Sequence, residues 1–299
     1  VQIPRLYSLF RSKRGADGQP QVQCFEEMLA HIFEPLVKAT LNPAEHPLVA
    51  QLLDNIVAFD SVDDESNPEQ PVDGSSAREW EREEQPNYSW QLYMLWGSLR
   101  TLNMLRDARG LNTIALRPHC GESGDPNHLA GAYLCAASIN HGIRLNESSV
   151  LQYLYYLDQV GCSISPISNH FLFVKAVNSP FPKFFKRGLN VTLSTDDPML
   201  FHLSEDPLLE EYTTARTAYD LSMLDMCELA RNSVLQSGFE GCRKAAWLGE
   251  GYANGAIGCD PGKCNVTHAR ATFRSRLLQE ERSLVGAIES SSAGASMDD

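Results

Sequence analysis

Short apolar segments alternate with longer segments of helical periodicity along most of this chain, and this alternation restricts the fold more than any other feature. Six segments have the length and composition of strands, and each leads toward a helix or a loop. They are VQIPRLY (1–7), NIVAFDSV (55–62), NTIALRPH (112–119), HGIRL (141–145), CSISPIS (162–168) and NVTLSTDDP (190–198). Repeated strand–helix units build parallel sheets. The alternation therefore predicts an α/β fold.

Two architectures accommodate six consecutive parallel units: a doubly wound sheet and a (β/α)₈ barrel. Neither GxGxxG nor GxxxxGK[ST] occurs in the sequence, which counts against the nucleotide-binding forms of the open sheet. We therefore expect a (β/α)₈ TIM barrel that lacks its first two βα units, followed by extra C-terminal helices. Residues 1–285 would form this catalytic barrel and residues 286–299 a disordered tail. Residues 66–87, rich in Glu, Pro and Ser, predict a solvated surface loop.

Composition excludes several kinds of partner. The formal charge of −13 argues against binding a nucleic-acid backbone, which requires clustered Lys and Arg. No segment approaches the ~18 consecutive apolar residues of a membrane span. The eight cysteines are scattered rather than arranged as a disulfide framework, which favours a reducing, cytosolic location.

Polar residues gather where the expected strands meet helices, and these positions lie on one rim of a barrel. Each group has an ordinary structural explanation when taken alone, such as a polar loop or a capped helix start. Together they supply imidazoles and carboxylates, which are ligands of catalytic zinc, with further groups left for proton transfer. The groups are Asp60, Asp63 and Asp64; His119 and Glu122; His141; Ser165 and Asn169; and Asp196 and Asp197.

At these residues the sequence resembles the adenosine/AMP deaminase family, and its AMP deaminase branch in particular. The resemblance runs through residues 1 to about 280 in the order of the family. HCGE and STDDP are shared with adenosine deaminases, whereas FDSVDDES and DMCELARNSVLQ are similar to AMP deaminases. The segments are FRSKRG (10–15), IVAFDSVDDES (56–66), LRPHCGE (116–122), HGIRL (141–145), SPISN (165–169), LSTDDPM (193–199), EEY (210–212) and DMCELARNSVLQSG (225–238).

The resemblance implies hydrolysis of AMP to IMP and ammonia on one zinc ion. By this resemblance His119 and Asp196 bind the zinc, and Glu122 protonates purine N1 as water attacks C6. His141 would position that water. The resemblance also implies that Asp197 hydrogen-bonds the purine and that the protein is a homotetramer. The residues expected to line the substrate beside Asp197 are Pro198, Met199 and Leu200.

One part of the family pattern is missing from this sequence. The resemblance implies two further zinc ligands, a His-x-His pair on the first barrel strand, and no such pair occurs here. The sequence is therefore expected to begin in the third strand and to be a partial sequence of an active enzyme. If it were complete, weak zinc binding and no turnover would be expected.

Three alternatives stay open. An adenosine deaminase-like enzyme would act on the nucleoside, and another barrel metallohydrolase would act on a cyclic amide. A non-catalytic barrel subunit would fit the absent His-x-His pair. Cytidine-type zinc deaminases are excluded because the chain has no Pro-Cys-x-x-Cys.

Overall fold

The computed structural model describes residues 1–67, 69 and 74–295, which divide into two compact units, Val1–Glu147 and Ser148–Asp299. In each unit helices accompany strands that pair in parallel, so the predicted α/β class is confirmed. Within the described ranges, no helix combines the length and the apolar character that crossing a membrane requires.

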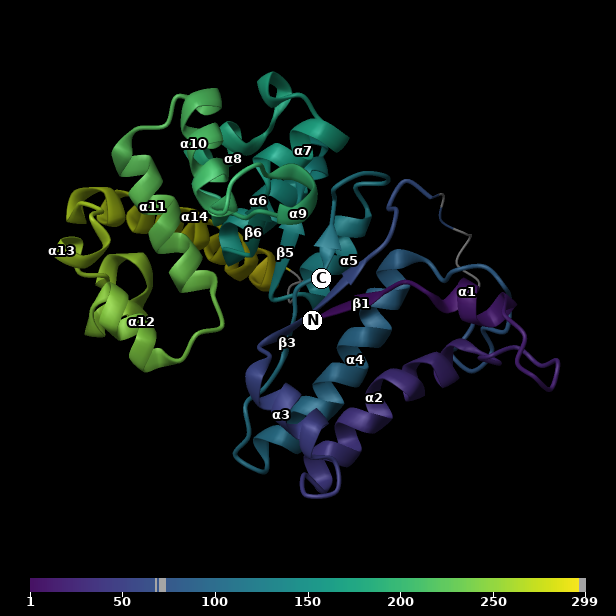
Figure 1. The fold of residues 1–299 in the computed structure, drawn as a ribbon. Helices are drawn as coiled ribbons and strands as arrows, with labels where there is room; N and C mark the ends of the chain where they lie inside the picture. Colours follow the sequence, from purple (N-terminus) through teal and green to yellow (C-terminus); the bar gives the residue numbers. More distant parts are fainter. Residues whose placement is uncertain (68, 70–73, 296–299) are drawn as a thin grey trace. The chain divides into compact units, whose positions relative to one another are not determined.

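The first unit combines short strands with longer helices (Figure 1). Strands β1, β2 and β3 pair in parallel in that order, and β4 pairs in parallel with β5. The elements are β1 (Gln2–Pro4), α1 (Tyr7–Ser12), α2 (Phe25–Leu41), α3 (Pro47–Asn55), β2 (Ala58–Val62), α4 (Tyr88–Asp107), β3 (Ala115–Leu116), β4 (His119–Cys120), α5 (His128–Cys135), β5 (Ser138–His141) and the 3₁₀ helix η1 (Ile143–Glu147).

The core of the first unit lies between these strands and helices α2, α3 and α4. Phe33 and Leu36 of α2 and Leu95 of α4 are buried in one cluster with Phe59 of β2 and Leu116 of β3. Full burial of side chains of this size stabilises a fold by roughly 1.5–3 kcal/mol each. The apolar residues that recur at helical spacing in α4 therefore form the face of this helix that enters the core.

The predicted strand 112–119 is two short strands in the structure. β3 ends at Leu116 and pairs with β2, whereas β4 begins at His119 and pairs with β5. Pro118 lies between them, and proline has no N–H to donate to a strand ladder. The prediction of a single strand was wrong because the proline divides the segment.

The prediction of a strand at 141–145 was also wrong in its position. The strand is Ser138–His141, and the residues after it form the 3₁₀ helix Ile143–Glu147. His141 and Gly142 have φ angles of 68° and 73°, which turn the chain out of the extended conformation. His141 therefore ends a strand rather than beginning one.

The second unit has one parallel strand pair, β6–β7, and its last part is helical. Phe181 and Phe184 of α8 are fully buried in this unit, as are Val191 of β7 and Leu229 of α11. The elements are α6 (Ser149–Asp158), β6 (Gly161–Ile164), α7 (Pro166–Leu172), the 3₁₀ helix η2 (Ala176–Asn178), α8 (Phe181–Arg187), β7 (Val191–Leu193), α9 (Pro198–Phe201), α10 (Pro207–Tyr219), α11 (Met223–Gln236), α12 (Gly241–Leu248), the 3₁₀ helix η3 (Glu250–Gly258), α13 (Pro261–Cys264) and α14 (His268–Ala295).

Two predictions about irregular segments differ from the structure in part. Helix α14 continues to Ala295, into the segment 286–299 expected to be a disordered tail, and residues 296–299 lie outside the described residues. In the loop 66–87, residues 68 and 70–73 also lie outside them. The indole of Trp80 is only 5% exposed and packs with Tyr7, Val22 and Phe25, so this part of the loop is anchored rather than solvated.

Candidate active site

His119 is held in one orientation by a carboxylate from β2. Its backbone N–H donates to Asp60 Oδ1 over 3.0 Å, and its ring Nδ1 lies 2.9 Å from the same oxygen. Because a carboxylate accepts hydrogen bonds, Nδ1 donates to Asp60, and in the neutral ring Nε2 then carries the lone pair. A carboxylate behind a histidine fixes zinc ligands in this way. The local structure therefore prepares Nε2 of His119 to bind a metal ion.

His141 lies beside His119 because its backbone departs from the regular strand. In the β4–β5 register, Cys120 pairs with His141 and His119 pairs with Asn140. Regular alternation would place His141 on the face of Cys120, opposite His119. The φ angle of 68° at His141 reverses the direction of its side chain, and the two imidazole centroids are 4.9 Å apart. A non-glycine residue in this conformation is strained, and such residues cluster at functional sites.

Glu122 completes the group in the first unit. Its Oε1 lies 3.3 Å from His141 Nε2, and the exposed fractions of the two side chains are 14% and 2%. The structure thus brings together three of the predicted site residues: His119, Glu122 and His141. A carboxyl group and an imidazole at this distance can exchange or share a proton.

Glu65 fixes the backbone of the loop that carries Glu122. Its Oε2 accepts from Gly121 N–H over 2.8 Å, and its Oε1 accepts from Glu122 N–H over 3.2 Å. Gly124 approaches the same residue so closely that a Cβ there would lie 1.7 Å from the Glu65 carbonyl oxygen. The requirement for glycine at this position is therefore steric.

His128 supplies a positive charge beneath this loop. Its ring nitrogens lie 3.2 Å from Glu65 Oε2 and 3.0 Å from Glu69 Oε1. Burial by itself lowers the pKa of His128, but the hydrogen bonds and charges of Glu65 and Glu69 oppose it and raise the pKa to about 9. His128 is therefore protonated at neutral pH and compensates for the two glutamates.

This elevated pKa predicts a pH-dependent free energy of unfolding. The folded pKa of about 9 exceeds the ordinary value of 6.5, so the stabilisation is complete below pH 6.5 and is lost as pH rises through 9. At about 1.4 kcal/mol per pKa unit, the loss is on the order of 3 kcal/mol. Urea unfolding across this pH range measures it. His128→Gln should flatten the profile, whereas His31→Gln, at an exposed position, should leave it intact. A wild-type profile without this decline would contradict the charge assignment.

Asp196 lies in the second unit, after β7, and is also held in the left-handed region. Its φ angle is 54°, and its Oδ2 accepts a short hydrogen bond from the Ser168 hydroxyl of α7. The hydroxyl directs the carboxylate without neutralising it. Thus the predicted metal-binding aspartate has strained backbone and a fixed side chain, as His141 has in the first unit.

The four residues predicted to contact the substrate follow Asp196 directly. Asp197 is the residue before α9, and Pro198 occupies the first turn of that helix. The Asp197 side chain does not cap the helix, so its carboxylate is not used in that way. Met199 and Leu200 are 95% and 75% exposed. The local structure therefore presents this segment at the surface of its unit.

Sequence reasoning assigned no role to three residues that orient the site. Asp60 and Glu65 belong to the acidic segment quoted for the resemblance, but that pattern does not reveal that Asp60 meets His119 or that Glu65 meets the 121–122 backbone. Ser168 lies within SPISN and gave no separate signal. Contacts of this kind join residues 28 to 59 positions apart, beyond the reach of local patterns.

Each predicted zinc ligand is of a donor type that zinc takes. His119 in the first unit presents an imidazole whose tautomer is fixed by Asp60, and Asp196 in the second unit presents a carboxylate held by Ser168. Imidazole nitrogen and carboxylate oxygen are common zinc ligands. Calcium and magnesium prefer sites made of oxygen ligands, so this donor set favours zinc over them.

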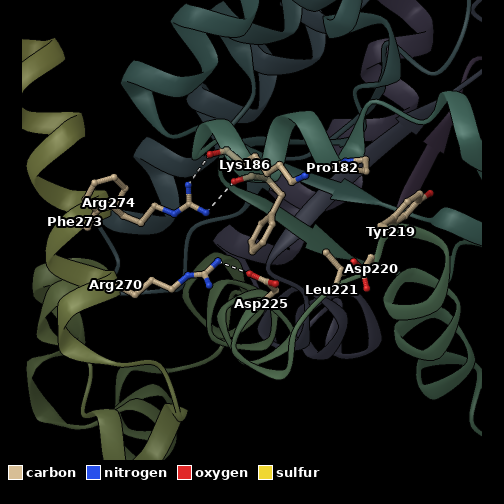
Figure 2. Close-up of a pocket in the computed structure, with 10 residues that line it drawn as sticks. Pro182, Lys186, Tyr219, Asp220, Leu221, Asp225, Arg270, Phe273 and Arg274 are labelled. Atoms are coloured by element: carbon tan, nitrogen blue, oxygen red, sulfur yellow. Dashed lines mark hydrogen bonds and ion pairs between the residues drawn. The ribbon is translucent and has the colours of Figure 1, made fainter.

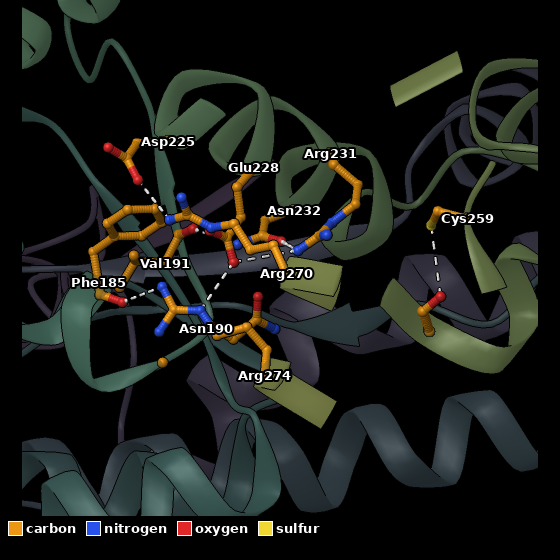
Figure 3. Close-up of polar contacts among 12 residues, drawn as sticks. Phe185, Asn190, Val191, Asp225, Glu228, Arg231, Asn232, Cys259, Arg270 and Arg274 are labelled. Carbon is orange, nitrogen blue, oxygen red and sulfur yellow. Dashed lines mark hydrogen bonds and ion pairs between the residues drawn. The ribbon is translucent and has the colours of Figure 1, made fainter. Parts of the chain in front are cut away.

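A cavity of about 390 Å³ in the second unit lies among the arginines of α14 (Figure 2). Arg270 bonds to Asp225 and Glu228, and Arg274 bonds to Glu228 and to the carbonyls of Phe185 and Lys186. Figure 3 shows the ion pairs by which Arg270 and Arg274 link α14 to Asp225 and Glu228 of α11. Because the arginines are already paired with carboxylates, the network is structural.

Comparison with known proteins places the chain in a family. The family model described as AMP deaminase matches residues 1–291. The chain belongs to the AMP deaminase family. AMP deaminase of Saccharomyces cerevisiae is 47% identical over 288 residues, which are 95% of this chain and 35% of the yeast protein. AMP deaminase of Dictyostelium discoideum is 45% identical over 291 residues, again 95% of this chain and 35% of the relative. The chain thus spans about a third of the length of these curated relatives.

Solved structures agree with the family at the level of fold. An amidohydrolase from Burkholderia ambifaria with bound zinc matches with a TM-score of 0.53 and 14% identity, covering 93% of this chain and 58% of that one. The N6-methyl-AMP deaminase of Arabidopsis thaliana matches with a TM-score of 0.50 and 16% identity, covering 82% and 55%. The family match confirms the predicted resemblance, and these structures add a similarity of fold alone.

Proposed function

We propose that this chain forms a catalytic region that hydrolyses AMP to IMP and ammonia with one zinc ion. The observation that carries the proposal is the group of His119, Glu122 and His141 at paired strands, with Asp60 setting the tautomer of His119. Membership of the AMP deaminase family supports AMP as the substrate. We further propose that the βα units belong to a (β/α)₈ barrel, with residues 1–285 in the catalytic region.

The proposed roles are those that the resemblance implies, and the local geometry is compatible with them. His119 and Asp196 are the zinc ligands, and a bound zinc ion would supply Lewis acidity that lowers the pKa of water. His141 orients the attacking water, and Glu122 beside it delivers a proton to purine N1. Asp197 hydrogen-bonds the purine, while Pro198, Met199 and Leu200 lie against the substrate. The exposure of Met199 and Leu200 is consistent with that role.

The test is ammonia release from AMP by the full-length protein, with adenosine measured in parallel. We expect turnover of AMP that disappears with a zinc chelator and returns when zinc is added. Preference for adenosine would favour the adenosine deaminase-like alternative. A folded, zinc-loaded protein that releases no ammonia from either compound would favour the non-catalytic barrel subunit.

The homotetramer is a proposal from the resemblance, and the cytosolic location is a proposal from the scattered cysteines. Light scattering on the purified protein would measure the first, and cell fractionation would measure the second. A monomer or dimer by light scattering would remove the tetramer from the proposal.

A further inference from the structure

The EEY segment of α10 has no part in the proposed chemistry, yet its two glutamates hold the chain on both sides of the proposed metal ligand Asp196. Glu211 is completely buried, and its Oε2 accepts from the backbone N–H of Ile167 over 3.1 Å. Its Oε1 lies 3.0 Å from Nε2 of His202. One carboxylate therefore joins the first turn of α7 to the end of α9.

Both connections lead to Asp196. Ile167 precedes Ser168, whose hydroxyl donates to Asp196 Oδ2. His202 ends α9, the helix that begins directly after Asp197. Loss of the Glu211 contacts would therefore affect both Asp196 and the segment that follows it.

The neighbouring residue Glu210 reinforces the second connection. Its Oε1 accepts from the backbone N–H groups of Leu203 and Ser204 over 3.1 and 2.5 Å. The two glutamates thus hold three consecutive residues, 202 to 204, onto α10. Glu211 alone also reaches α7, which makes it the residue common to both supports.

The burial of this pair shows that the contact is costly to break. The His202 and Glu211 side chains are 1% and 0% exposed. Nδ1 of His202 has no hydrogen-bond partner among the residues that the structure describes, so Glu211 is the polar contact of this ring. A buried group that loses its partner costs about 1–3 kcal/mol. A variant of Glu211 that leaves this ring without its polar contact therefore destabilises the observed position of His202.

We propose that Glu211 is a positioning residue for Asp196 and for the substrate segment 197–200, acting through Ser168 on one side and His202 on the other. The proposal rests on the proposed function in assigning Asp196 to zinc. It adds a residue that touches neither metal nor substrate and that sets the orientation of groups that do.

The first experiment measures zinc affinity by competition with a chelator in Glu211→Gln, a change that preserves the shape of the side chain. Loss of an outer contact of a metal ligand typically lowers affinity about 10- to 100-fold, and we expect a loss in that range. Glu205→Gln, at an exposed position nearby, is the control and should bind zinc as the wild type does.

A double-mutant cycle separates positioning from general destabilisation. If Glu211 acts on Asp196 through Ser168, then Glu211→Gln should have a much smaller effect on zinc affinity in a Ser168→Ala background. Effects that add fully in the double variant would overturn this route. So would an unchanged zinc affinity in Glu211→Gln.

Hydrogen exchange of the zinc-free protein keeps this proposal distinct from the proposed function. In Glu211→Gln we expect faster exchange at the amides of Ile167 and of residues 202–204, with α11 unchanged. Unchanged exchange at these amides would overturn the positioning role whatever the metal does. Faster exchange in a protein whose wild type binds no zinc would support the positioning role and reject the zinc assignment.

Discussion

Replacing Glu122 with glutamine is expected to lower kcat for AMP by about 100- to 10,000-fold, the usual contribution of a positioned general acid or base. Glutamine keeps the size and hydrogen-bonding shape of the side chain but has no proton to deliver to N1. The Glu65 contacts should persist because they involve the backbone of Gly121 and residue 122. Steady-state ammonia release measures the effect, with zinc content determined on the same samples.

Glu147→Gln provides the comparison for this variant. Glu147 pairs with Arg144 at the surface, where its side chain is 43% exposed, and an exposed pair contributes little. We expect its kcat to match that of the wild type. If Glu122→Gln kept more than about a tenth of the wild-type kcat, the general-acid role would have to pass to another group.

Glu228→Gln is expected to reduce the free energy of unfolding by about 3–5 kcal/mol, as when one partner of a buried ion pair is removed. Glu228 is 4% exposed and meets Arg231, Arg270 and Arg274 at 3.5, 2.6 and 3.2 Å (Figure 3). Burial lowers the pKa of Arg231, which shows how unfavourable its charge is in this place. Its Nε and Nη1 already have no hydrogen-bond partner within the described residues.

The matched control is Glu240→Gln, which removes the exposed pair Glu240–Arg243. Its expected cost is below about 1 kcal/mol. Urea unfolding followed by circular dichroism measures both variants. Equal stabilities for Glu228→Gln and Glu240→Gln would mean that the network adds nothing to the attachment of α14.

The class of fold was predictable from the sequence because the spacing of apolar residues indicates which face of a helix or strand is buried. Leu92, Leu95, Leu99 and Leu102 recur at helical spacing and all lie on the buried face of α4. Strand boundaries were less predictable, since an apolar residue is equally suited to a strand or to a buried 3₁₀ turn. Ile143 and Leu145 are buried in such a turn and not in the expected strand.

The residues of the candidate site were identifiable from motifs, but their geometry was not. HCGE places His119 and Glu122 three positions apart, which specifies neither ring orientation nor distance. His141 approaches His119 only because its backbone is left-handed, and no local propensity favours that conformation for histidine in a strand. The supporting carboxylates of Asp60, Glu65 and Glu211 depend on contacts between distant segments.

The left-handed backbone at His141 and Asp196 also has an evolutionary consequence. It determines which substitutions would become favourable at these positions in a related protein that was no longer under selection for catalysis. Any side chain in that region costs about 1–2 kcal/mol of strain, whereas glycine adopts it freely. If the imidazole or the carboxylate were no longer needed for catalysis, substitution by glycine at either position would remove this backbone strain. Glycine at positions 141 and 196, in an otherwise intact sequence, would therefore be an early sign that a related protein has lost the activity.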